Sequence, residues 1–343
     1  MKPAIIAAVV VVGAAIGAGV VLVATGTVPL DLGALQGATS SSKEDGSASG
    51  DPKSAAPATK SGGDDSAYIA FDQGKYLTAL SLAEQRAGLG DPQAHTLVGR
   101  IYEGGHGVAK DDITAARWYA RAAELGDVPA MLAFGNMLAE GRGVGKDRVA
   151  AGAMFEKAAM TGDPMANYNL GLLFLSGDGK PENPHRGAKH IQYAAEKGLA
   201  QAQYDLAVLY QNGAGVPNDA LEAARWMSRA AAQGHMAAEY EYAVMLLRGM
   251  GLKVDEAKAI DYLRGSAEKG VPGAQNRLAH VYLEGIAGIP QNSFEAAKWR
   301  LIAKAGGITD EKLDLVLKSL SDKDLAEAQK AAQEWQDKRL AFR

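Results

Sequence analysis

The chain repeats itself with a period of 36 residues. Six glycines of one series keep this spacing, and a seventh member follows after 37 residues. The series is Gly90, Gly126, Gly162, Gly198, Gly234, Gly270 and Gly307. A fixed period of this length indicates one small unit stacked many times. Because such a unit buries its apolar face only against a neighbour, the fold must be an extended array.

Small and bulky residues alternate at helical spacing after each of these glycines. One column is small: Ala94, Ala130, Ala166, Ala202, Ala238 and Ala274. A bulky column follows four residues later: Val98, Phe134, Leu170, Leu206, Tyr242 and Leu278. This spacing predicts a first helix with one packed face in every unit.

A glycine-rich turn and a second helix complete each unit. The turn reads GHGV, GRGV, GDGK, GAGV and GMGL at 36-residue intervals from Gly105, and GIAGI from Gly285 carries one extra residue. Glycine suits a turn between antiparallel helices because it adopts left-handed backbone conformations. The Gly145-Lys146 pair does not form a phosphate loop, since Asp147 follows where Ser or Thr is required. The second helix has its own small column: Ala115, Ala151, Gly187, Ala223 and Ala259.

Composition excludes several classes of function. The formal net charge of −4 and a pI near 5.9 give no basic field for nucleic acid. The chain has no cysteine, which excludes disulfides, thiolate metal sites and a cysteine nucleophile. No two of the six histidines have the i, i+4 spacing of paired metal ligands. We therefore predict no catalytic residues, no metal and no cofactor, and hence a protein that is not an enzyme.

The N-terminal segment predicts a membrane anchor over residues 1–30. Residues 4–24 carry no charge, and 21 residues of helix span about 31 Å, which matches a bilayer core. Lys2 precedes this span and the next basic residue is Lys43, so the N-terminus is predicted to be cytoplasmic. A cleaved signal peptide is the alternative. Gly13 and Gly17 predict a homodimer through this span, unless they are only small residues of an ordinary anchor.

Residues 31–66 predict a flexible linker. The stretch is rich in Ser, Gly, Ala, Pro, Lys and Asp, and it cannot bury enough apolar area to offset its ordering entropy. It would let the following domain move near the membrane surface.

The repeats resemble the Sel-one-like repeat (SLR), a 36-residue relative of the tetratricopeptide repeat. The segments ARWYARAAELG and AARWMSRAAAQG, ending at Gly126 and Gly234, match its second helix closely. The resemblance covers six units over 91–307, after a shorter entry helix pair over 67–90. It implies an all-α, right-handed α-solenoid of antiparallel helix pairs over 67–307. Residues 308–343 leave the period but stay helical, with Ser321 as a candidate N-cap, and should cap the stack.

The resemblance also implies a concave groove lined by the first helices. Groove positions carried over from the tetratricopeptide fold give a candidate site for a partner protein: Tyr168, Tyr204, Tyr240, Asn169, Asp205, Glu241, Arg277, Arg100 and Asn136. Tyrosines in register beside Asn and carboxylates are typical of a protein-binding surface. The alternative is that these tyrosines only pack between neighbouring repeats.

The expected function is that of a scaffold or adaptor. SLR proteins hold other proteins, so the chain is predicted to bind a peptide segment or helix of an envelope protein in the groove. Its predicted location is the bacterial inner membrane, single-pass, with the repeats in the periplasm. Two alternatives remain open: a peptidoglycan-associated enzyme or its accessory, and a periplasmic regulator of a membrane sensor kinase.

Overall fold

The computed structural model describes residues 65–286 and 288–341, and every regular element within these ranges is an α-helix. The predicted all-α class is therefore confirmed for this part of the chain. The predicted span 4–24, with Gly13 and Gly17, and most of the linker lie outside the described residues. Within the described residues, no helix combines the length and apolar character needed to cross a membrane.

The helices belong to two compact units that meet in sequence at Glu182 and Asn183. The first unit contains α1 (Ser66–Asp72), α2 (Tyr76–Gly88), α3 (Pro92–Gly104), α4 (Asp112–Glu124), α5 (Val128–Glu140), α6 (Arg148–Met160) and α7 (Pro164–Ser176). The second contains α8 (Pro184–Glu196), α9 (Ala200–Asn212), α10 (Ala220–Ala232), α11 (Met236–Arg248), α12 (Glu256–Glu268), α13 (Pro272–Glu284), α14 (Ser293–Ala305), α15 (Glu311–Ser319) and α16 (Asp322–Ala341).

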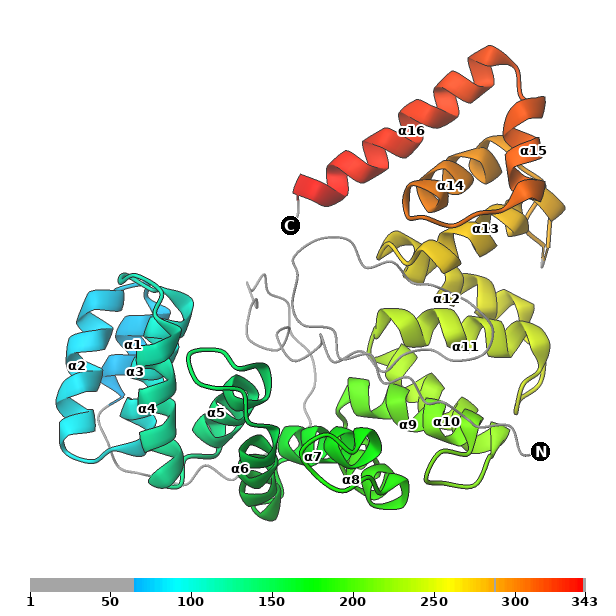
Figure 1. The fold of residues 1–343 in the computed structure, drawn as a ribbon. Coiled ribbons are helices and arrows are strands. Elements are labelled where there is room, and N and C mark those ends of the chain that lie inside the picture. Colours follow the sequence, from blue (N-terminus) through cyan, green and yellow to red (C-terminus); the bar gives the residue numbers. More distant parts are fainter. Residues whose placement is uncertain (1–64, 287, 342–343) are drawn as a thin grey trace, which may run out of the picture. The chain divides into compact units, whose positions relative to one another are not determined.

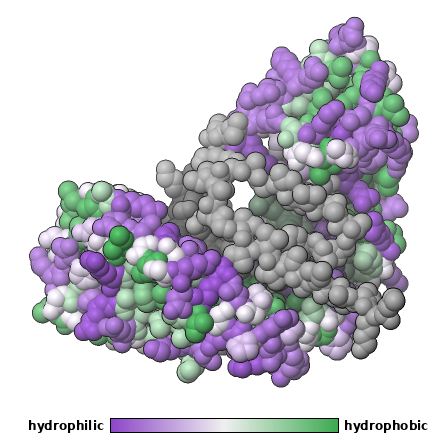
Figure 2. Space-filling model, viewed as in Figure 1, coloured by the Kyte–Doolittle hydropathy of each residue, from purple (hydrophilic) through white to green (hydrophobic). Residues whose placement is uncertain are grey.

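Successive helices of each unit pack against one another, from α1 to α7 and from α8 to α15, and α16 packs on α14 (Figure 1). The visible surface of both units is mostly polar, with apolar residues in small patches (Figure 2). The apolar residues of the repeats lie between helices, where alanines such as Ala130, Ala202 and Ala259 are fully buried.

Local sequence determines where the helices begin and end. The side chains of Asp91, Asp127 and Asp163 accept backbone N–H groups at the starts of α3, α5 and α7. These carboxylates satisfy donors that have no partner within the helix. At the other end, the first glycine of each turn, such as Gly141, adopts a left-handed conformation and closes the helix.

The second glycine of each turn has a different role. A Cβ atom on Gly143 would overlap the carbonyl oxygen of Asp112, which begins the second helix of the preceding repeat. The same overlap would occur between Gly179 and Arg148, and between Gly251 and Ala220. The turn of one repeat therefore lies directly on the backbone of the previous repeat. This contact, more than the turn geometry, requires the second glycine.

Helices within a repeat fit by complementary size. A Cβ atom on Gly135 of α5 would lie 2.6 Å from the Phe155 ring of α6, and one on Gly99 of α3 would lie 2.8 Å from the Tyr119 ring of α4. In the second unit, alanine replaces this glycine, as at Ala243, and the facing residue is the smaller Leu263. At Gly99 and Gly135 the glycine therefore makes room for the facing aromatic ring.

Two repeat contacts of the first unit carry ion pairs of opposite polarity. Arg142, in the second turn, pairs with Asp112 at 3.2 Å and with Glu103 at 2.7 Å. At the equivalent place in the next contact, Asp178 pairs with Arg148. The basic residue lies in the turn in the first contact and at the start of the second helix in the next. Pairing shifted by one repeat would bring like charges together, so the ion pairs favour the observed neighbours.

The last repeat ends the stack with a charge. The core column of the second helices is Tyr119, Phe155, Ile191, Met227 and Leu263, and its next member is Arg300, which is 1% exposed. The Arg300 Nε atom donates to Asp314 of α15 at 2.9 Å, and Nη1 donates to the Ile308 carbonyl at 2.9 Å. A further repeat would place apolar side chains against this buried charge, which is unfavourable. Helix α15 packs there instead and supplies Asp314 as the partner of Arg300.

The residues after the last repeat form α15 and α16. Ser321 accepts the N–H of Asp324 at the start of α16, as expected of an N-cap. Ala328 and Ala332 of α16 are buried, and the Trp335 ring lies 5.9 Å from the Trp299 ring of α14. Residues outside the 36-residue period therefore cover the last repeat.

Replacing Gly143 with Ala should lower the free energy of unfolding of the first unit by about 3 kcal/mol. The methyl group would meet the Asp112 backbone, and the left-handed conformation adds strain. Gly145→Ala is the matched control, since a Cβ atom there meets nothing within 4 Å. Urea denaturation followed by circular dichroism measures both. Equal losses in the two variants would contradict the role of the second glycine.

Docking of the cap should weaken below about pH 4. Burial raises the pKa of Asp310, but hydrogen bonds from Asn276, from the Leu313 N–H and from His280 outweigh it and lower this pKa to about 2. A lowered carboxylate pKa contributes stability above the unfolded value, near 3.9, and this contribution is lost as the pH falls toward 2. Trp299 and Trp335 fluorescence reports the loss. In Asp310→Asn the cap should already be weaker at pH 6, whereas the exposed-site control Asp261→Asn should match the parent.

Candidate functional site

One predicted groove column contains three residues that contact the N-cap of a following helix. The column consists of Thr96, Leu132, Tyr168, Tyr204, Tyr240 and Asn276. The Thr96 hydroxyl donates to the N-cap Asp127 at 2.7 Å. The Tyr204 ring stacks on the N-cap His235 with 4.8 Å between ring centroids, and Asn276 donates to the N-cap Asp310 at 2.8 Å. Sequence analysis missed this structural role, because it depends on contacts between residues 31 to 34 positions apart.

The predicted site residues differ in accessibility. Tyr168, Tyr204, Asn169 and Asp205 are 5% exposed or less. The half-buried members are Asn136, Tyr240, Glu241 and Arg277, and Arg100 is exposed. Buried side chains offer a partner little area, so the accessible part of the predicted site consists of these last five residues.

In the first unit, two asparagines of the site meet. Asn169 of α7 donates from Nδ2 to Asn136 Oδ1 of α5 at 3.5 Å, a long hydrogen bond. Asn169 Oδ1 is buried and has no hydrogen-bond partner. The Arg100 guanidinium carbon lies 5.0 Å from the centre of the Phe71 ring of α1, which holds this cation beside the entry helix pair.

In the second unit, Tyr240 and Arg277 interact across neighbouring repeats. Arg277 of α13 lies beside the Tyr240 hydroxyl. A Cβ atom on Gly273 would lie 3.1 Å from Tyr240 Cζ, so the ring lies on the backbone of α13. Burial raises the pKa of Tyr240, and the Arg277 charge opposes this shift. Tyr240 is thus both a packing residue and part of the half-buried surface.

Glu241 differs from the other partly buried carboxylates of the second unit. Glu239, Asp310 and Asp314 each pair with a basic side chain, namely Lys269, His280 and Arg300. Within the described ranges, no basic side chain lies within ion-pair distance of Glu241. Burial raises the pKa of Glu241, an effect that the Arg248 charge opposes. The chain therefore keeps a desolvated carboxylate that its own described residues do not neutralise.

Asp205 lies one repeat before Glu241 in the same column, on α9. It is fully buried, and Gln201 Nε2 lies 3.3 Å from both of its carboxylate oxygens. Carboxylates at the same position of adjacent repeats give this face of the second unit an acidic character, which Arg277 reverses on α13.

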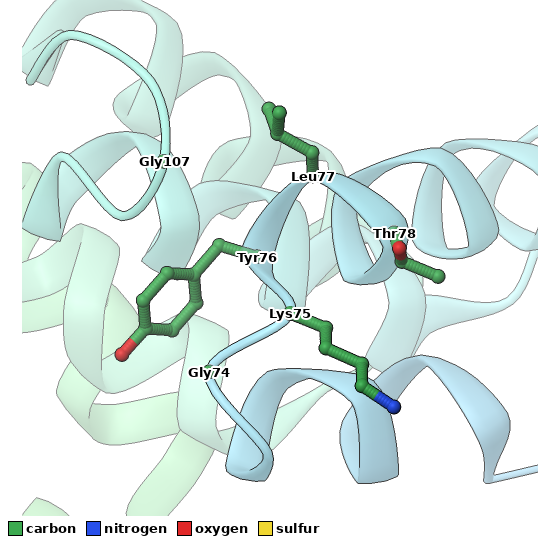
Figure 3. A pocket seen from close by; sticks show the side chains of 6 residues that line it. All are labelled: Gly74, Lys75, Tyr76, Leu77, Thr78 and Gly107. Atoms are coloured by element: carbon green, nitrogen blue, oxygen red, sulfur yellow. The ribbon is translucent and has the colours of Figure 1, made fainter.

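No other group of described residues suggests chemistry. Over residues 65–286 and 288–341, no three His, Asp or Glu side chains are placed to hold a metal ion. A shallow pocket at the start of α2 is lined by Gly74, Lys75, Tyr76, Leu77, Thr78 and Gly107 (Figure 3). The Tyr76 and Lys75 side chains point in different directions there, and the lining contains no carboxylate, histidine or serine.

Comparison with protein families matches the Sel1 repeat at six places: residues 92–127, 128–163, 164–199, 200–235, 237–271 and 272–307. Together these matches cover more than half of the chain, and it belongs to the Sel1 repeat family. The six repeats predicted from the 36-residue period are confirmed. None of the curated proteins compared is a match.

The similar solved structures include the following two. One is a protective antigen of uropathogenic Escherichia coli strains that displays an SLR fold, at 29% identity and a TM-score of 0.64. The match covers 77% of this chain and 56% of that one. The other is a Sel1 repeat protein from Oxalobacter formigenes, at 28% identity and a TM-score of 0.62, covering 69% of this chain and 95% of that one. Sel1 repeat proteins are helical scaffolds that bind other proteins and are generally not catalytic.

Replacing Glu241 with Gln should stabilise the second unit by about 1 kcal/mol at pH 7. A raised carboxylate pKa means that the charged form costs stability, and the amide removes that charge. The difference from the parent should shrink as the pH falls to about 4.5, because the parent then becomes neutral too. Urea denaturation at both pH values measures it. Asp261→Asn, on the exposed side of α12, is the control, and a variant less stable than the parent would contradict this interpretation.

Proposed function

We propose that this chain is a membrane-anchored scaffold whose repeats lie outside the cytoplasm and bind a segment of an envelope protein. The inner surface of the second unit, formed by Tyr240, Glu241 and Arg277, is the proposed binding surface. The partner presents a lysine or arginine side chain to Glu241. In the first unit, considered by itself, the accessible predicted groove residues are Arg100 and Asn136.

The unpaired state of Glu241 carries this proposal. A half-buried carboxylate without a counter-ion among the described residues lowers the stability of the fold. Binding sites commonly retain residues that lower stability, because those residues serve the interaction with a partner. A cation from a partner would complete the pair and share hydrogen bonds with Tyr240. Aromatic area beside a charge is also typical of protein interfaces.

The location is supported by different observations. Residues 4–24 have the length of a membrane span, and the basic residues around it favour a cytoplasmic N-terminus. The similar E. coli protein is described as a protective antigen. The span and its flanking charges are the observations behind the proposed inner-membrane location with periplasmic repeats.

A peptide selection tests the binding surface. The full chain, solubilised in detergent, is exposed to a library of displayed peptides, and the selected peptides are sequenced. Peptides selected by the parent should be enriched in lysine and arginine. Glu241→Lys should reverse this enrichment, and Glu241→Gln should weaken binding about tenfold or more, as expected for loss of a partly buried charged hydrogen bond.

The matched control is Asp261→Lys, which places the same charge change on an exposed part of α12. It should select the same peptides as the parent. If Glu241→Lys and the parent selected the same peptides, the inner surface would not be the binding site.

A further inference from the structure

The first helix of the fifth repeat, α11, begins with a histidine where three other repeats have an aspartate. Asp91, Asp127 and Asp163 cap α3, α5 and α7, whereas His235 caps α11. His235 Nδ1 accepts the N–H of Ala238 at 3.2 Å. A ring nitrogen that accepts a hydrogen bond carries no proton, so this cap requires the neutral imidazole.

The second ring nitrogen defines the tautomer. His235 Nε2 lies 2.8 Å from Gln201 Oε1 of α9, and an amide oxygen only accepts. The proton of the neutral ring therefore lies on Nε2 and bridges to the preceding repeat. The ring also stacks on Tyr204 at an angle of 25°. His235 thus connects the start of α11 to a residue of the predicted groove.

The charged groups near this cap come from α11 and α12. The start of α11 carries the positive end of the helix dipole. Lys269, at the end of α12, donates to the Gly234 carbonyl at 3.2 Å and pairs with Glu239, one turn along α11, at 2.5 Å. Lys269 already compensates that carboxylate. From α9, the ring contacts Tyr204 and Gln201, and Gln201 in turn contacts the Asp205 carboxylate.

We infer that His235 is a pH-sensitive cap that regulates the inner surface of the second unit. A proton on Nδ1 would face the Ala238 N–H, so two donors would oppose each other and the cap would be lost. Histidine takes up its proton between about pH 5 and 8, whereas the aspartate caps remain charged in this range. Acid therefore loosens the start of α11, including the turn that holds Tyr240 and Glu241. This regulation rests on the proposed binding function.

Hydrogen exchange on the full chain, without any partner, tests the cap. Protection of the backbone amides at 236–241, corrected for the intrinsic effect of pH, is compared at pH 7.5 and 5.5. The parent should lose about fivefold in protection at pH 5.5, as expected for the loss of an N-cap. His235→Asp restores the cap used by three other repeats and should show no loss. His235→Asn serves the same purpose if the aspartate variant does not fold.

His185→Gln is the matched control, because His185 is an exposed histidine of α8 in the same unit. It should keep the pH dependence of the parent. Equal protection of the parent at both pH values, or the same loss in His235→Asp as in the parent, would overturn the pH-sensitive cap.

Peptide binding tests the link to function separately. A peptide selected by the parent should bind less tightly at pH 5.5, and His235→Asp should keep more of its affinity than the parent does. The comparison removes the titration of Glu241 itself, which both proteins share. If the exchange changes with pH but both proteins lose the same affinity, the cap is pH-sensitive and the regulation of binding is wrong. If no peptide binds, the exchange result still stands alone.

Discussion

The fold depends on one close approach, that of the second turn glycine to the backbone of the preceding repeat. A repeat consists of two helices of 13 residues, which by themselves bury little apolar surface. Its stability therefore comes from the contact with its neighbours. At Gly143, Gly179 and Gly251 the turn lies against the first carbonyl of the previous second helix. Any side chain there would separate the repeats and open the alanine-rich layer between them. The repeats that meet at these turns are therefore held in the same way, whereas a Cβ atom on Gly288 in the last turn would meet nothing within 4 Å.

Charges define which repeats meet and where the array ends. The opposite polarity of the Arg142 and Arg148 ion pairs distinguishes two contacts that otherwise look alike. At the C-terminal end, Arg300 takes a position that is apolar in the other repeats and binds Asp314 of the cap. A buried charge contributes little net stability, but it selects a single neighbour, since an apolar helix in that place would leave the guanidinium unpaired.

The inner surface combines packing with exposure to partners. Residues of the first groove column reach the cap of the next helix, so Tyr204 and Asn276 stabilise the stack itself. Glu241, in the adjacent column, has no such role and keeps an unpaired charge. A surface built in this way has a rigid frame with a small number of free polar groups, which favours a partner that supplies the missing charge. Membership of a family of protein-binding scaffolds is consistent with this division.

The sequence by itself determined the repeat, its length, the two helices and the glycine turns. Each of these follows from local spacing, and the six repeats and the cap at Ser321 agree with it. The candidate columns were also identified from register alone, but their accessibility was not. Only the tertiary structure showed that Tyr168 and Tyr204 are buried while Tyr240 and Glu241 remain partly open. It also revealed the His235 cap and the Arg300 cluster, because both depend on contacts with other helices that a 36-residue period cannot encode. Spacing decides which residues share a face, whereas the neighbour on that face decides whether a charge is paired.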